Sequence, residues 1–457
     1  MKIVIFGTGA MYQKYKKFFI DASIICFLDN DETKWGTKIN GILIRQPQDI
    51  IKIDFDFVFL VSVHFAEMRA QLLSLKVSEE KIIDIYHPGL FKNMNQIRRY
   101  EVRGVQAKEQ KGRILLVSHA LNLSGAPVVL GQMAEVFHDR GYAVEVYAQE
   151  NGQVEELLYQ LLEQRIQVSL YARLEWIDID MVCDNYDMVV VNTIVLYPIV
   201  QKLSGKKIPV IWWLHEEEDV YRNMRFRQQK IEVGKNVHVY AVGNRARRAF
   251  EKYSNNQSAE IMLYGIREKA YRENAKAEGK KLVFALIGLG CERKGQDIVY
   301  EVINKRLLDW VDLVEVWFIG EIAETKRKMY DENPCIFCKG ILNPKEITEL
   351  YNRIDVLLCP SLHDPMPVVV SEAMMYKKPC IVSDMTGQYE FITPFVNGLT
   401  CEAGVVDSLE EVMEWAIKHR NQLDKIGMQG YQVYKEYFSA DSFEYKVGEI
   451  IGRYLPG

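Results

Sequence analysis

The sequence lacks the features that mark several large classes of protein. Its 457 residues hold no apolar run that approaches the roughly 18 to 20 residues needed to span a bilayer. The formal net charge is only -5, so the concentrated basic field of a nucleic-acid-binding protein is missing. The eight cysteines are scattered, which fits a reducing cytoplasm better than a disulfide framework. We therefore expect a cytoplasmic protein without a nucleic-acid partner.

A signal peptide and a metal site are also not expected. Lys2 is followed at once by IVIFGTG, which has the pattern of a strand and a turn. The CIFC motif places Cys335 and Cys338 at a metal-ligand spacing, but no second ligand pair lies nearby. The motif more simply predicts a short strand, so we expect no metal ion.

Short β-branched runs alternate with helical stretches, which predicts an α/β fold of parallel sheets flanked by helices. Polar stretches at 91–112 and 267–281 separate three sets of runs. We predict linkers there, doubly wound units at 1–90, 113–266 and 282–437, and a C-terminal helix at 438–457 that packs back on the second unit. Strands are expected at 2–7, 23–29, 57–63, 81–85, 113–120, 143–149, 187–193, 209–216, 237–243, 259–265, 282–290, 314–320, 335–340, 355–360 and 379–384.

The segment HDPMPVVVSE, residues 363–372, follows one of these strands. Pro367 suits the first turn of a helix, where its missing N–H costs nothing. A helix starting there would offer free backbone amides to an anion such as a diphosphate. Glu372 could then accept hydrogen bonds from two ribose hydroxyls, and Asp364 could reach the other end of the ligand. Alternatively, VVV is a strand and both acids are solvated.

Three other loops have a similar position at the end of a strand. In GLGCERKGQD, Arg293 and Lys294 could neutralise a departing diphosphate, and Gly295 would allow close backbone approach. In SGAP, Ser124 and Gly125 open a helix whose N-terminus could face a phosphate. His215 ends the strand IWWLH. Each loop also has an ordinary structural interpretation, as a solvated turn, a helix start or a structural histidine.

From about Arg113 onward, these loops together resemble the retaining glycosyltransferases of family 4, which have the GT-B fold of two facing Rossmann-like domains. The family is marked by two acids separated by seven residues, matched here by Asp364 and Glu372. The resemblance also covers RKGQD, the SGAP loop, WWLHE with His215, and the segments GQYEF and VNG, which contain Gly387 and Gly398.

The resemblance implies a role for each matched residue. Glu372 would hold the ribose hydroxyls, and Asp364 would face the donor sugar. Arg293 and Lys294 would bind the diphosphate together with backbone amides near Pro367 and Val368. Gly125, with Ser124, would let the first GT-B domain approach donor and acceptor, and His215 would contact the donor sugar or phosphate.

The resemblance also implies the chemistry. The basic pair would replace a divalent ion, and the leaving phosphate would take the acceptor proton as the hydroxyl attacks from the same face. No enzymic nucleophile or cofactor is then expected. Two positions depart from the family pattern: Asp364 replaces the usual glutamate, and Leu289 stands where an arginine is frequent, so that Arg293 is the candidate to supply this charge.

The first ninety residues form a separate problem. Gly7 and Gly9 follow the first strand, but Tyr12 stands where a dinucleotide fingerprint has its third glycine. Asp29 falls where a ribose-binding acid would lie. The segment 27–42 resembles the small Rossmann-like domain attached to some sugar-modifying enzymes. We expect an accessory domain that binds a nucleotide-sugar or a protein partner; NAD is not expected.

Basic residues suggest one further partner, an anionic membrane at its inner face, because cations near such a surface favour binding. A solvated linker and helix face explain them equally well. They are Lys92, Arg98, Arg99, Arg103, Lys108, Lys111 and Arg113 in the first linker, and Arg222, Arg225, Arg227 and Lys230 in a second segment.

The sequence therefore predicts a glycosyltransferase that moves a sugar from a nucleotide-diphosphate sugar to a glycan or lipid-linked glycan in polysaccharide biosynthesis. Two other hypotheses remain. The protein could be a non-catalytic scaffold that binds nucleotide-sugars or glycans, or an oxidoreductase or epimerase built on the first domain.

Overall fold

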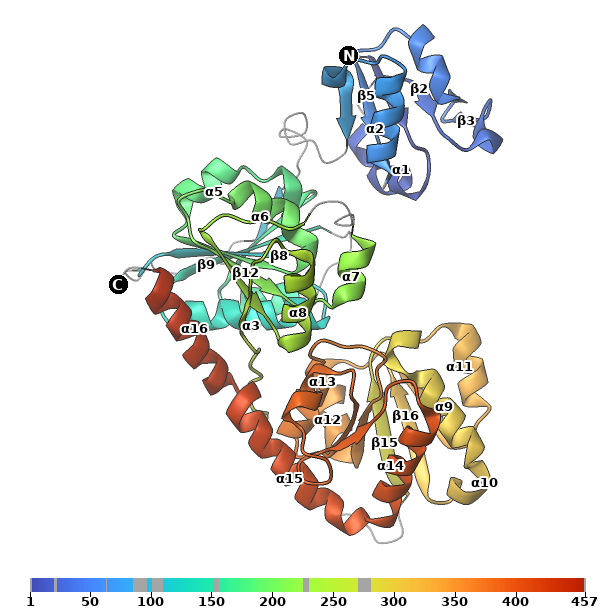
Figure 1. Ribbon diagram of the computed structural model, residues 1–457, viewed down its shortest axis with the longest axis vertical. Coiled ribbons are helices and arrows are strands. Elements are labelled where there is room, and N and C mark those ends of the chain that lie inside the picture. Colours follow the sequence, from blue (N-terminus) through green and yellow to red (C-terminus); the bar gives the residue numbers. More distant parts are fainter. Residues whose placement is uncertain are drawn as a thin grey trace. The chain divides into compact units, whose positions relative to one another are not determined.

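The computed structural model describes residues 2–19, 23–62, 64–84, 97–100, 110–150, 156–224, 230–269 and 281–455. Two compact units are distinguished in it. The first consists of Met1–Arg98 with Tyr171–Asp178, and the second of Arg99–Leu170 with Ile179–Gly457. The predicted α/β fold is confirmed, because parallel sheets flanked by helices make up both units (Figure 1).

The first unit contains a six-stranded sheet in the order β3-β4-β2-β1-β5-β6. Its pairs are parallel except β3 with β4. Apolar side chains of β1, which are buried from Ile3 to Phe6, form the centre of the sheet. Its elements are β1 (Lys2–Phe6), α1 (Ala10–Tyr15), β2 (Ser23–Leu28), β3 (Lys38–Ile39), β4 (Ile42–Arg45), β5 (Phe57–Leu60), α2 (Phe65–Ser74) and β6 (Ile82–Asp84).

The second unit contains two sheets, the first in the order β14-β13-β12-β11-β8-β9-β10-β7. Its central strands β11 and β12 are buried along their whole length. The elements are β7 (Ile97–Tyr100), β8 (Arg113–Ser118), α3 (Gly125–Asp139), β9 (Ala143–Gln149), α4 (Glu156–Glu163), β10 (Gln167–Tyr171), α5 (Ile179–Asn185), β11 (Met188–Asn192), α6 (Tyr197–Leu203), β12 (Val210–Leu214), α7 (Glu218–Asn223), β13 (Val237–Ala241), α8 (Asn244–Tyr253) and β14 (Glu260–Ile261).

The prediction of a linker at 91–112 was wrong for four of its residues. Ile97–Tyr100 forms β7, the edge strand beside β10. The sequence IRRY gave no apolar pattern because an edge strand tolerates charged side chains. The strand β10 was also not predicted.

The other sheet has the order β17-β16-β15-β18-β19-β20, so the strand order reverses between β15 and β18. Loops that follow strands on either side of such a reversal form a crevice at the carboxyl edge of the sheet. The elements are β15 (Leu282–Ile287), α9 (Gln296–Lys305), α10 (Leu307–Trp310), β16 (Val314–Ile319), α11 (Glu324–Asp331), β17 (Ile336–Gly340), α12 (Pro344–Arg353), β18 (Val356–Cys359), α13 (Val368–Met375), β19 (Cys380–Ser383), β20 (Leu399–Cys401), α14 (Val406–Lys418), α15 (Leu423–Val433) and α16 (Ala440–Tyr454).

The C-terminal helix α16 contacts the first sheet's helix α3, and Figure 1 shows it as the long red helix beside α3. The Nη2 atom of Arg140 donates to the carbonyl of Glu444 at 2.7 Å, and Arg453 pairs with Glu260 at 2.7 Å. These contacts connect the end of the chain to the 113–266 segment.

Several predicted features lie partly outside the described residues. Of the predicted linker at 267–281, only 267–269 and 281 are described. The CIFC motif lies at β17, and all eight cysteines are free. Within the described ranges, no helix is both long and apolar enough to cross a membrane. The same part of the chain contains no group of three or more His, Cys, Asp or Glu side chains that could hold a metal ion.

Candidate functional site

Two loops meet where the strand order reverses: the loop after β15 and the loop after β18. Gly295 makes the contact possible, because a β-carbon there would lie 2.6 Å from the carbonyl oxygen of Pro360. Its φ of +81° also favours glycine. The amide of Leu362 donates to the carbonyl of Arg293 at 2.8 Å and joins the two loops. The predicted close backbone approach at Gly295 is therefore an approach to the neighbouring loop.

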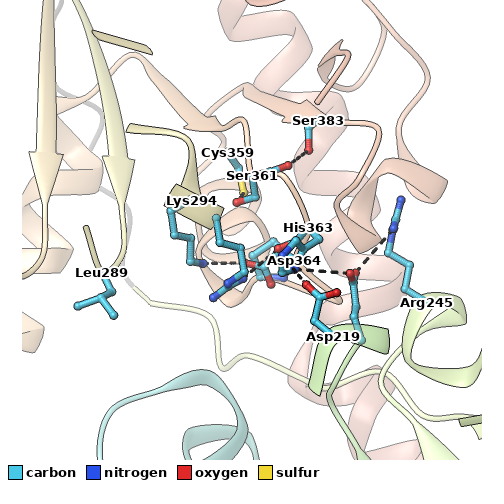
Figure 2. Close-up of polar contacts among 12 residues, drawn as sticks. Asp219, Arg245, Leu289, Lys294, Cys359, Ser361, His363, Asp364 and Ser383 are labelled. Atoms are coloured by element: carbon cyan, nitrogen blue, oxygen red, sulfur yellow. Dashed lines mark hydrogen bonds and ion pairs between the residues drawn. The ribbon is translucent and has the colours of Figure 1, made fainter. Parts of the chain in front are cut away.

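Three of the predicted site residues form one charged cluster in these loops (Figure 2). Lys294 Nζ lies 2.6 Å from Asp364 Oδ2, and Arg293 Nη1 lies 3.1 Å from the same oxygen. Arg293 also donates to the carbonyl of His363 at 3.0 Å. The side chain of Asp364 is only 10% exposed, and the two cations pair with it in this partly desolvated position. The cluster carries a net positive charge at the carboxyl edge of the sheet.

Leu289 occupies the position where the family frequently has an arginine. Its side chain is exposed, and Figure 2 labels it near the loop that carries Lys294. Arg293, four residues later, is the cation of this loop that lies beside Lys294 at Asp364, and its replacement of the family's arginine stays a prediction. Its side chain is 38% exposed, which leaves its guanidinium accessible to a ligand.

The loop that carries Asp364 is held by a second segment, residues 385–387. The amide of Asp364 donates to the carbonyl of Met385 at 3.1 Å, and the amide of Gly387 donates to the carbonyl of Asp364 at 2.9 Å. Thr386 completes a parallel bridge with Asp364. The GQYEF motif therefore positions the acid.

Helix α13 begins one residue later than predicted. Pro367 is its N-cap with extended backbone angles, and Val368 is its first helical residue. Because proline has no N–H, the free amides come from Val368 onward. The carbonyl of Pro367 accepts hydrogen bonds from Gln388 at 2.8 Å and from Tyr264 at 3.2 Å. These two side chains hold the start of the helix in place.

Glu372 lies in the second turn of α13, as predicted. The hydroxyl of Tyr351 donates to its Oε2 at 3.0 Å. Burial raises the pKa of Glu372, while the nearby charge of Lys269 and the Tyr351 hydrogen bond oppose this shift. The ring of Tyr351 is stacked on that of Tyr376, with centroids 4.8 Å apart. Tyr351, which the sequence did not single out, therefore orients Glu372, the residue that is predicted to bind the ribose.

Tyr351→Phe should raise the KM for the sugar donor about fivefold and leave kcat nearly unchanged. The substitution removes one hydrogen bond to a carboxylate, which is worth roughly 1.5 to 3 kcal/mol at most. The matched control is Tyr376→Phe, because the hydroxyl of Tyr376 contacts Thr348 instead. Steady-state kinetics with varied donor would measure both. Equal KM values for the two variants would contradict this role.

Helix α3 of the first sheet begins near α13. Ser124 is its N-cap and Gly125 its first residue, as the sequence predicted. A β-carbon built on Gly125 would lie 3.6 Å from Cγ2 of Val368, so the two helix N-termini approach each other. Ser124 donates from its hydroxyl to Asn122 at 2.5 Å. Two sets of free helix amides therefore lie close together, which favours an anionic ligand.

His215 follows β12 at the carboxyl edge of the first sheet. Burial and the neighbouring His119 lower its pKa to about 3, so its ring is neutral at pH 7. Its Nε2 and the Nδ1 of His119 are buried without a hydrogen-bond partner among the described residues. The ring centroids of Trp213 and His215 are 4.6 Å apart. The sequence missed His119, although it also follows a strand of this sheet.

A second charged cluster was not predicted, although His363, Glu217 and Asp219 lie in motifs that the sequence analysis singled out; Arg245 does not. Both ring nitrogens of His363 face carboxylates: Nε2 lies 2.8 Å from Asp219 Oδ2, and Nδ1 lies 3.9 Å from Glu217 Oε2. Arg245 lies 3.7 Å from Glu217 (Figure 2). Burial raises the pKa of Glu217 to about 7, opposed by Arg245 and reinforced by the charge of Asp364. The second cluster is thus coupled electrostatically to the cluster of Arg293, Lys294 and Asp364.

Glu216 should make stability depend on pH. Burial raises its pKa to about 7, against hydrogen bonds from Ile194, His215 and its own amide. The ordinary value is 4.5, so its contribution to the free energy of unfolding is present below that pH and lost as the pH rises through about 7. Urea unfolding of wild type and Glu216→Gln should show the variant gaining roughly 1 to 3 kcal/mol relative to wild type between pH 5 and pH 8. Parallel stability curves would contradict this assignment.

In the first unit, the structure brings Asp29 against the loop that contains Gly7 and Gly9. Burial alone would raise the pKa of Asp29, but hydrogen bonds from Thr8, Asp31 and Lys34 lower it below its usual value. The amide of Thr8 donates at 3.0 Å and Lys34 Nζ lies at 3.1 Å. A β-carbon on Gly7 would lie 2.6 Å from the carbonyl oxygen of Val61, whereas Gly9 has open space. Asp29 thus joins the loop of Gly7 and Gly9 to the loop that follows β2, and its role in binding a ligand stays a prediction.

Comparison with known families agrees with this arrangement. Residues 110–260 match the family described as "Glycosyl-transferase family 4", and residues 267–433 match "Glycosyl transferases group 1". Together these matches cover more than half of the chain. It is a family 4-type glycosyltransferase. Residues 1–83 of this glycosyltransferase match a different family, "C2185-like, N-terminal".

Solved structures show the GT-B fold of the glycosyltransferase. Anabaena HepE in complex with UDP and glucose has a TM-score of 0.61 at 16% identity and covers 75% of this chain and 100% of its own. Sucrose-phosphate synthase from Thermosynechococcus elongatus has a TM-score of 0.60 at 14% identity, over 76% and 99% of the chains. WaaG, a glycosyltransferase involved in lipopolysaccharide biosynthesis, has a TM-score of 0.57 at 15% identity, over 75% and 100%.

A curated relative matches only a short segment. An uncharacterized glycosyltransferase of Methanocaldococcus jannaschii is 37% identical over 60 residues, which are 13% of this chain and 15% of that protein. This match therefore adds nothing on substrates.

Proposed function

We propose that this glycosyltransferase transfers a sugar, with retention of anomeric configuration, from a nucleotide-diphosphate sugar to a glycan or lipid-linked glycan. The observation that carries the proposal is the cluster of Arg293, Lys294 and Asp364 beside the N-terminus of α13. Two cations and a set of helix amides fit a diphosphate. Glu372, one helical turn further on, fits the ribose. HepE, whose structure contains UDP and glucose, supports the choice of ligand class.

In the proposed reaction, the acceptor oxygen bonds to the anomeric carbon as the bond from that carbon to the phosphate oxygen breaks. The acceptor proton passes to the departing phosphate oxygen, so the reaction needs no catalytic base from the protein. Lys294 and Arg293 stabilise the negative charge that develops on the diphosphate, which is the role a divalent ion has in other enzymes. Asp364 holds the cations in place and faces the donor sugar, and neutral His215 contacts that sugar or its phosphate.

We further propose polysaccharide biosynthesis in the cytoplasm as the setting, with an inner-membrane acceptor. WaaG, which is involved in lipopolysaccharide biosynthesis, has a similar fold and supports this choice. The first unit would then be an accessory domain that binds a nucleotide-sugar or a partner.

Incubation with a panel of UDP-, GDP-, dTDP- and ADP-sugars in the presence of EDTA tests the activity. One donor should release its nucleoside diphosphate, and Glu372→Ala should abolish that release. The anomeric configuration of the product, measured by NMR, should equal that of the donor. A protein that binds a donor but releases nothing with any acceptor would be a scaffold. Release that requires a divalent ion would contradict the role given to the cation pair.

A further inference from the structure

Part of the basic stretch around residue 100 lines a cavity of about 250 Å³ in the second unit. Arg99 and Tyr100 of β7 and Arg113 of β8 contribute to it, together with side chains of β9, β10 and the end of α5. Arg113 begins β8, whereas Ser118 ends that strand and leads to the loop at Gly125. At about 3.3 Å per residue, the six-residue strand places the cavity roughly 15 Å or more from the transfer site.

A partly buried polar network lines the cavity on the side of β9 and β10. Glu145 accepts hydrogen bonds from Ser169 at 2.6 Å and from Tyr186 at 2.5 Å. The hydroxyls of Tyr147 and Tyr186 are 3.0 Å apart, and both tyrosines are more than nine-tenths buried. Burial and the hydrogen bond to Glu145 raise the pKa of Tyr186, which keeps its hydroxyl protonated. The carboxylate is therefore already satisfied by the protein and does not call for a cation.

Two arginine side chains, those of Arg99 and Arg113, bring more positive charge to this cavity than Glu145 offsets. The guanidinium of Arg113 lies 5.1 Å from the ring centroid of Tyr186. Among the described residues, neither guanidinium forms an ion pair with a carboxylate, although Glu145 lines the same cavity and Asp187 accepts a hydrogen bond from the backbone amide of Arg113 at 2.7 Å. Two guanidinium groups suit a phosphate, since each can donate two parallel hydrogen bonds to it. Hydroxyl groups of the polar network and the ring of Tyr100 suit a sugar.

We propose that this cavity is a second ligand site, remote from the transfer site, which binds a sugar that carries a phosphate group through Arg99 and Arg113. The volume is near the lower limit of small-molecule pockets, which fits one phosphorylated monosaccharide. The phosphate has two possible sources: a free sugar phosphate, or the phosphate of a lipid headgroup at a membrane surface.

Titration calorimetry of the full chain with glucose 6-phosphate tests the proposal. Arg99→Gln and Arg113→Gln should each raise the dissociation constant at least tenfold. Lys111→Gln is the matched control, because Lys111 belongs to the same basic stretch but does not line the cavity. It should change the constant less than twofold. Lys294→Ala should also leave the constant unchanged, since the transfer site is separate.

Sedimentation with phosphatidylglycerol vesicles forms the second arm. Vesicle binding that needs both arginines, without binding of glucose 6-phosphate, would retain the anion site and assign the phosphate to a lipid. No binding of either probe, or binding that neither arginine substitution weakens, would overturn the proposal. Loss of glucose 6-phosphate binding in Lys294→Ala alone would also overturn it. Arg99 lies at an exposed position, so its substitution keeps the test valid if Arg113→Gln does not fold.

Discussion

Lys294→Ala should lower kcat/KM for sugar transfer about a thousandfold. Lys294 Nζ lies 2.6 Å from Asp364 in the loop after β15, and its side chain is only 16% exposed. In the proposed reaction it stabilises the charge that develops on the diphosphate, so its removal raises the transition state more than the ground state. The fold should survive, because Asp364 keeps its ion pair with Arg293.

Lys305→Ala is the control for this prediction. Lys305 is an exposed lysine at the end of α9 that pairs with Asp407 and Glu410. Initial-rate measurements over a range of donor concentrations would give kcat/KM for both variants. We expect less than a twofold change for Lys305→Ala. An active Lys294→Ala enzyme would show that another group neutralises the leaving phosphate.

Gly387→Ala should lower activity at least a hundredfold and destabilise the protein by about 2 kcal/mol or more. A β-carbon at this position would lie 1.8 Å from the carbonyl oxygen of Pro365 and 3.0 Å from Cε of Met366. No side-chain movement relieves a clash with backbone, so the loop that carries Asp364 must move. Asp364 would then move away from both cations, because the amide of Gly387 helps to hold this acid in place through the carbonyl of Asp364.

Gly452→Ala provides the comparison for Gly387. Gly452 lies in α16, and a β-carbon there would meet nothing within 4 Å. Alanine should keep full activity and raise the free energy of unfolding by up to about 1 kcal/mol. Thermal unfolding and transfer rates would be measured on both variants. A Gly387→Ala protein with normal activity would show that the Asp364 loop tolerates displacement.

Much of the fold follows from the sequence, because buried parallel strands are short apolar runs. Strands such as β12 and β15 are apolar throughout and were predicted within a few residues. Two of the missed strands, β7 and β3, lack this pattern for a physical reason. The edge strand β7 carries two arginines in four residues, and β3 has only two residues. Neither needs a continuous apolar sequence, since an edge strand is exposed on one side.

The candidate site was predictable where one loop contains the chemistry. Asp364 and Glu372 lie on one segment, and Arg293 and Lys294 on another. The spacing of each motif alone left a structural interpretation open, and the resemblance of the whole set to the family selected these residues. The contacts of His363 with Glu217 and Asp219 were not predictable, because they join residues more than a hundred positions apart. The role of Tyr264 was hidden for the same reason, because its hydrogen bond reaches Pro367 at the start of α13. Tyr351 lies only 21 residues before Glu372, but it belongs to no recognised motif, so its hydrogen bond was not predicted either.

The position of a bound nucleoside diphosphate tests the central claim most directly. A crystal structure with the diphosphate that the donor panel selects should show its phosphates in contact with Lys294 Nζ, Arg293 and the first amides of α13. The ribose hydroxyls should lie on the carboxylate of Glu372. A diphosphate bound elsewhere, with the ion pairs between Asp364 and its two cations undisturbed and Glu372 in contact only with Tyr351, would contradict the account.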